Sequence, residues 1–125
     1  MHWRHSMKKQ HGVLVVATPA LIAALLLGGC AGGPAKPAVK ATPQGEQAFK
    51  NVCAMCHVPG LAGAPIYGKK EDWAARIEQG MDVLYKHAIM GYVGSKGMMP
   101  PKGGQVSMPD ADVKAAVDYM VAGSM

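Results

Sequence analysis

A chain of 125 residues is long enough for one domain and a targeting segment, but too short for two separately packed cores. The net charge of +5 comes from the first 43 residues, because residues 44–125 carry eight Lys and Arg against eight Asp and Glu. A near-neutral folded part with a single Phe offers neither a basic surface nor a stacking surface, which argues against a nucleic-acid partner. About 80 residues bury a marginal core, so we expect a metal, a disulfide or a covalent cofactor to stabilise it.

The first thirty residues predict an export signal of the lipoprotein kind. Residues 1–12 are basic and His-rich, and the apolar run 13–27 is too short for a comfortable membrane span. Leu27-Gly28-Gly29-Cys30 follows and resembles a bacterial lipobox, which implies removal of residues 1–29 and lipidation of Cys30. We therefore expect an exported protein anchored through Cys30 to the inner or outer membrane, facing the periplasm. The alternatives are an ordinary signal peptide with an unrelated Cys, and a true start at Met7.

A tether then separates the anchor from the folded domain. Residues 30–43 are rich in Pro, Gly and Ala and show no apolar period, so they cannot bury enough surface to fold. We place the folded domain at residues 44–125.

The motif that carries the chemistry is Cys53-Ala54-Met55-Cys56-His57. Two intervening residues place both thiols on one turn, where each can add to a haem vinyl group, and His57 can then face the iron. A structural zinc site needs a second pair of ligands, and His87 is the only other candidate after the tether. A thioredoxin-like pair needs a surrounding βαβ pattern, which the sequence lacks. The motif therefore predicts one covalently attached haem c.

The second axial ligand is predicted to be Met99. Pro100 favours extended backbone at Met99, and the run Pro100-Pro101-Lys102-Gly103-Gly104 predicts a stiff, non-helical loop. This loop lies about forty residues after His57, far enough for the chain to pass around the haem. Met98 and His87 are the alternatives, although His87 falls inside a predicted helix, where a surface or hydrogen-bonded histidine is expected.

The remaining pattern predicts an all-α fold of about four short helices around one haem. Apolar spacing predicts helices over residues 44–52 and 70–79, and a third from Asp82 that stops at Gly91. A last helix is predicted where Ser107 and Asp110 have capping-box spacing and the residues Val113, Ala116, Val117 and Met120 follow a helical period. No segment alternates at period two over a useful length.

These motifs together resemble the cytochrome c-five group of the class I cytochromes c, over residues 44–125. The resemblance rests on the haem motif, on Gly63-Ala64-Pro65, Trp73-x-x-Arg76-Ile77 and Gly80, on Met99-Pro100-Pro101-Lys102-Gly103-Gly104, and on a helix ending Asp118-Tyr119-Met120. It implies thioether bonds from Cys53 and Cys56 and axial ligation by His57 and Met99. It also implies Pro65 beside the His57 ring, with a nearby carbonyl accepting its Nδ1 proton, and Trp73 or Arg76 near a propionate. Many relatives have a disulfide after the Gly-Gly pair, whereas residues 105–108 here contain no Cys.

A haem iron with both axial positions filled carries one electron at a time and binds no substrate, so the predicted function is electron transfer and not catalysis. The resemblance implies that this electron transfer serves a respiratory chain. Expected partners are redox proteins such as a cytochrome bc complex, a terminal oxidase or a periplasmic dehydrogenase. One rival is a sensor or peroxidase in which Met99 dissociates, and another is a fixed subunit of a larger oxidoreductase. No distal His, Arg or acid accompanies Met99 to polarise a bound peroxide, which argues against the peroxidase.

Overall fold

The computed structural model describes residues 38–125, a part of the chain that behaves as one compact unit. The predicted signal peptide, the predicted lipidation site Cys30 and most of the predicted tether lie outside the described residues. Within residues 38–125, no helix has the length and apolar character needed to cross a membrane.

The first helical run is longer than the sequence predicts and carries the haem motif at its end. It comprises α1 (Pro43–Ala48), a π-helical segment (Phe49–Cys53) and α2 (Ala54–His57). The Thr42 side chain caps its start by accepting a hydrogen bond from the backbone of Gly45 at 3.1 Å. The prediction stopped this helix at residue 52, because a π-helical turn breaks the regular apolar period on which the prediction relied.

Two helices follow where the pattern places them. A short 3₁₀ turn (Leu61–Gly63) leads to α3 (Lys70–Ile77), which ends two residues earlier than predicted, and then to α4 (Met81–Met90). Gly91 ends α4 with a φ of 85°, as expected of a glycine that stops a helix.

A small antiparallel hairpin is the element that the sequence does not reveal. Strand β1 (Tyr92–Gly94) pairs with β2 (Gly97–Met99), and Tyr92 lies opposite Met99. Three residues per strand are too few for alternation to be recognised. A 3₁₀ segment (Pro101–Gly104) follows, with left-handed backbone at Lys102 and Gly103, so the predicted loop departs from regular helix.

The last helix, α5 (Asp110–Ala122), forms as predicted, but its start does not. Its N-cap is Pro109 and no side chain caps it, so the capping box proposed for Ser107 is wrong. In a capping box the acidic residue stands at the third position of the helix, whereas Asp110 is the first residue of α5.

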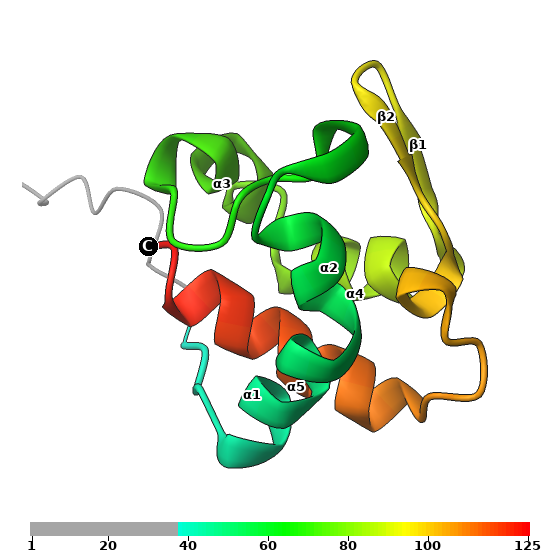
Figure 1. The fold of residues 1–125 in the computed structure, drawn as a ribbon. Coiled ribbons are helices and arrows are strands. Elements are labelled where there is room, and N and C mark those ends of the chain that lie inside the picture. Colours follow the sequence, from blue (N-terminus) through cyan, green and yellow to red (C-terminus); the bar gives the residue numbers. More distant parts are fainter. Residues whose placement is uncertain (1–37) are drawn as a thin grey trace, which may run out of the picture. The chain divides into compact units, whose positions relative to one another are not determined.

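The core forms where α5 packs against the first helical run and α4, and these helices lie side by side in Figure 1. Its buried apolar residues come from the first helical run and from α3, α4 and α5: Ala48, Phe49, Trp73, Leu84, Ala88, Val113, Ala116, Val117, Met120 and Val121. The predicted class, a mostly helical fold of about four helices, is confirmed, with the hairpin as an addition.

Candidate functional site

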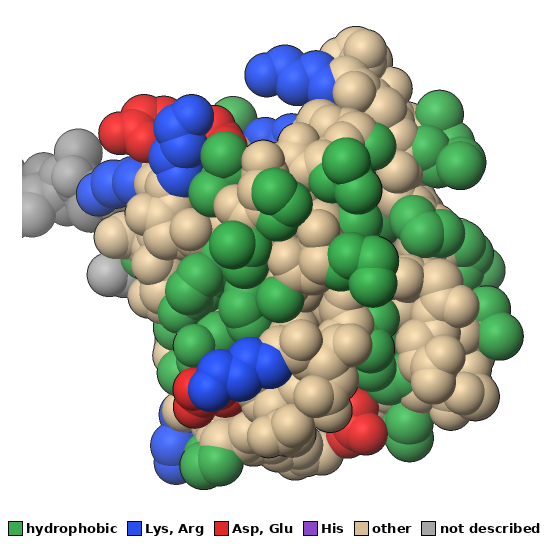
Figure 2. Space-filling view, in the orientation of Figure 1, with side chains coloured by type: hydrophobic (Ala, Val, Ile, Leu, Met, Phe, Trp, Pro, Cys, Tyr) green, Lys and Arg blue, Asp and Glu red, His purple; other side chains and the backbone are tan. Residues whose placement is uncertain are grey.

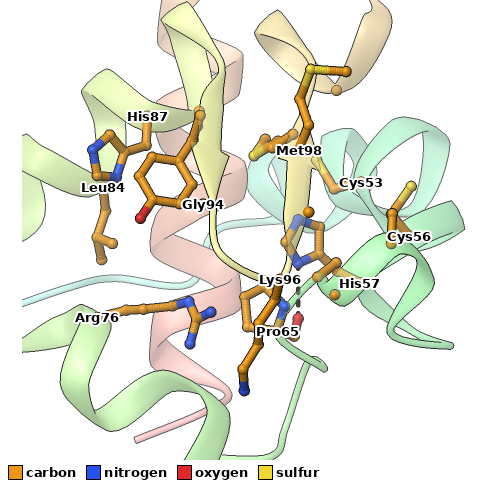
Figure 3. A pocket seen from close by; sticks show the side chains of 18 of the residues that line it. Cys53, Cys56, His57, Pro65, Arg76, Leu84, His87, Gly94, Lys96 and Met98 are labelled. Carbon is orange, nitrogen blue, oxygen red and sulfur yellow. Dashed lines mark hydrogen bonds between the residues drawn. The ribbon is translucent and has the colours of Figure 1, made fainter.

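A cavity of about 350 Å³ lies beneath the haem motif. Residues from α2, α3, α4 and the hairpin contribute to its wall, as Figure 3 shows for His57, Arg76, His87 and Met98. All seven residues that the sequence analysis assigns to the haem line this cavity: Cys53, Cys56, His57, Pro65, Trp73, Arg76 and Met99. Folding therefore brings Met99 to the same cavity as the motif that lies more than forty residues earlier in the chain.

The His57 ring is buried, with 6% of the residue exposed, and its orientation is fixed. Its Nδ1 lies 2.9 Å from the carbonyl oxygen of Pro65, drawn as a dashed line in Figure 3. A carbonyl only accepts, so Nδ1 carries the hydrogen and Nε2 keeps a free lone pair. Burial lowers the pKa of His57 below 6.5, although the bond to Pro65 works in the opposite direction and the Arg76 charge adds to the lowering. The ring is thus neutral, the form that binds iron.

The two cysteines lie one helical turn apart and both are half-buried at the cavity wall. Burial raises the pKa of the Cys53 thiol to about 11, although a hydrogen bond from the backbone N–H of Cys53 works in the opposite direction. Cys53 is therefore a neutral thiol at physiological pH, and a thioether at this position would place no charge in the apolar wall.

Met99 occupies the end of β2, where its backbone is extended as the following proline predicts. It is half-buried and packs against the hydrophobic core. Met98 also lines the cavity but is 64% exposed. Of the two methionines, Met99 is therefore the better shielded from water.

Trp73 and Arg76 both line the cavity from α3. The indole N–H of Trp73 already donates to the Ile66 carbonyl at 2.8 Å, and the ring lies 6.0 Å from that of His57. The Arg76 guanidinium donates to the Asp72 carbonyl, which leaves its other N–H groups free to meet an anion. Trp73 thus forms a wall of the cavity, and Arg76 retains donors that suit a carboxylate.

Sequence reasoning underestimated His87. It lines the cavity, is half-buried and lies 4.3 Å, ring centroid to ring centroid, from Tyr92. The hairpin creates this contact by turning Tyr92 back over α4. The local sign of this turn is the pair of glycines, Gly94 and Gly97, that flank Ser95-Lys96, although Ser-Lys is not one of the Gly- or Asn-containing pairs that predict a tight hairpin.

The donor set, which comprises two thiols, an imidazole nitrogen and a thioether sulfur, fits a haem that would be attached through two thioether bonds. The cavity is lined largely by apolar and small residues, as a macrocycle requires. Among residues 38–125, no three His, Cys, Asp or Glu side chains come together in a way that could hold a bare metal ion.

Comparison with known proteins agrees with this chemistry. Residues 40–120 match the family described as cytochrome C oxidase, cbb3-type, subunit III. The chain is 50% identical over 80 residues to cytochrome c-555 of Chlorobaculum tepidum, and the aligned region covers 64% of this chain and 74% of that protein. It is 32% identical over 78 residues to cytochrome c5 of Azotobacter vinelandii, covering 61% and 89% of the two chains.

A similar solved structure is the cytochrome in a crystal structure of the electron transfer complex of nitrite reductase with cytochrome c. The two chains are 36% identical, with a TM-score of 0.61 over 69% of this chain and all of the other. At this level of identity the likeness concerns the family as well as the fold.

Proposed function

The chain belongs to the class I monohaem c-type cytochromes, and we propose that it carries single electrons on the periplasmic side of a membrane in a respiratory chain. One covalently bound haem c is common to this family, and Cys53, Cys56 and His57 fit its attachment motif. When bound, that haem supplies an iron that alternates between the ferrous and ferric states.

In this proposal each residue at the cavity has a definite task. Cys53 and Cys56 would hold the haem covalently, and His57 and Met99 would supply a nitrogen and a sulfur to its iron. The observation that carries the proposal is the bond from His57 to the Pro65 carbonyl, because it leaves Nε2 free in a buried, neutral ring. The N–H groups of Arg76 that are not used in its bond to the Asp72 carbonyl would bind a propionate. Two filled axial positions leave no place for a substrate, as an electron carrier requires.

We assign attachment to the membrane to Cys30, on the sequence pattern alone. The lipobox-like run directly before it supports this assignment, and the Pro/Gly/Ala-rich residues that follow would let the domain reach partners near the membrane.

Electron exchange is proposed to occur where apolar side chains surround the haem motif. Met55, Val58 and Leu61 are 75%, 56% and 57% exposed. Met55 lies inside the attachment motif, Val58 follows it directly, and Leu61 begins the 3₁₀ turn. Figure 2 shows hydrophobic side chains across the middle of one face, with charged side chains toward its margin. Such a surface suits brief docking of redox proteins. The likeness to a cytochrome c complexed with nitrite reductase supports a periplasmic oxidoreductase as one such partner, besides a cytochrome bc complex or a terminal oxidase.

The test is the optical spectrum of the ferric holoprotein, which should show the weak far-red band of methionine sulfur bound to ferric haem. Met99→Ala should abolish the band, whereas Met98→Ala, a matched control on the same strand, should keep it. A wild-type protein that lacks the band and readily binds carbon monoxide or cyanide would instead be a ligand-binding haem protein.

A further inference from the structure

Lys102 is one of two non-glycine residues with left-handed backbone among residues 38–125, with φ 52° and ψ 31°. Gly103 and Gly104, which follow, also have positive φ. Left-handed backbone is unfavourable for a residue with a Cβ atom and persists only where the surrounding contacts impose it. A glycine would serve the turn better, so the lysine side chain must contribute something else.

The Lys102 ammonium bonds to two groups at the start of the last helix. Its Nζ lies 2.7 Å from Oδ1 of Asp110 and donates to the carbonyl of Met108 at 2.8 Å. The Lys102 side chain is only 19% exposed, although that of Asp110 is 59% exposed. A lysine largely covered by protein and bound to two acceptors is more strongly held than an ordinary surface ion pair.

These bonds close the loop that runs from β2 to α5, drawn in orange in Figure 1. Lys102 lies three residues after Met99, and the far end of the loop belongs to a helix whose buried residues form much of the core. Within residues 38–125 the loop has no covalent cross-link, since the two cysteines described are both in the haem motif. The Lys102 ammonium therefore ties the segment that presents Met99 to the most firmly packed helix.

We propose that Lys102 is a positioning residue for Met99, holding the methionine sulfur at the iron through its bonds to Asp110 and the Met108 carbonyl. This inference rests on the proposed role of Met99 as axial ligand. Without the ammonium, the loop gains freedom and Met99 yields more easily to a competing ligand.

The experiment measures imidazole binding to the ferric holoprotein, because imidazole must displace the methionine. Lys102→Gly suits the left-handed backbone yet removes the ammonium, and should bind imidazole about fivefold more tightly than wild type. Lys102→Arg keeps a cation and should stay close to wild type, while Asp110→Asn should fall between. Lys50→Gln is the matched control, since Lys50 pairs at 2.7 Å with Glu46 on the first helical run.

A purely structural lysine would change the unfolding midpoint without changing the imidazole affinity. The proposal is overturned if Lys102→Gly binds imidazole within twofold of wild type, or if Lys50→Gln tightens binding equally. Failure of the proposed ligand is seen separately, because wild-type protein would then lack the far-red band before any variant is made.

Discussion

Replacing Gly97 by alanine should disturb the contact between the β1–β2 hairpin and the 3₁₀ turn at Leu61–Gly63. A Cβ atom at Gly97 would lie 2.0 Å from the carbonyl oxygen of Ala62, whereas ordinary contact begins at 3.4 Å. The two backbones must therefore separate by more than 1 Å. The φ of 150° adds backbone strain, because residues with a side chain rarely adopt it.

The magnitude follows from these two costs. Backbone strain of this kind costs about 1–2 kcal/mol, and forcing atoms into a filled space costs about 1–3 kcal/mol more. We expect Gly97→Ala to lose roughly 3–4 kcal/mol of unfolding free energy. Gly80→Ala is the matched control, since Gly80 has a φ of 92° with no atom within 4 Å of the added Cβ, and should lose only the strain.

The assay is urea unfolding of the holoprotein followed by haem absorbance, together with the rate of cyanide binding to the ferric form. If the hairpin tip lifts away to accommodate the methyl group, the cavity opens and cyanide should bind faster in Gly97→Ala than in Gly80→Ala. The reasoning is refuted if the two variants unfold with equal free energy and bind cyanide at equal rates.

Two further predictions concern hydrogen bonds around the cavity and on α4. Trp73→Phe removes the bond to the Ile66 carbonyl from a site that is 4% exposed, and should cost about 2 kcal/mol of unfolding free energy in the same urea assay; an unchanged midpoint would contradict this. Burial, together with the bond to Asp118, raises the pKa of Tyr85 to about 12, from 10.0. Because the unfolded chain ionises first, this group's stabilising contribution is lost as the pH rises from about 10 to 12. Tyr85→Phe should therefore show a shallower loss of stability between pH 10 and 12 than wild type, and an identical slope would count against the assignment.

The local patterns of the sequence predict the helices and the haem chemistry well. The haem motif depends on residues within five positions of one another, and the extended backbone at Met99 depends on the proline that follows it. α4 and α5 follow apolar periods that a reader can count. Such features need no knowledge of distant parts of the chain, because the physical cause lies within one or two turns.

Some local patterns were misleading because another local structure prevailed. Ser107 has the spacing of a capping residue, yet Pro109 begins the helix and the serine lies in the preceding turn. The first helix outlasts its apolar period because a π-helical segment shifts the phase and continues to His57. In both cases a pattern correctly identified the helix and misplaced one of its ends.

By itself, the sequence determined the class of cofactor, the residues that fit its attachment motif and the helical class of the fold, because each depends on residue types at short, fixed spacing. Only the tertiary structure decided which carbonyl accepts from His57, that His87 reaches the cavity, and that Lys102 bonds to the start of α5. These contacts depend on where the hairpin and the loops turn. Each turn is set by packing between elements that lie far apart in the chain, and no local period records such packing.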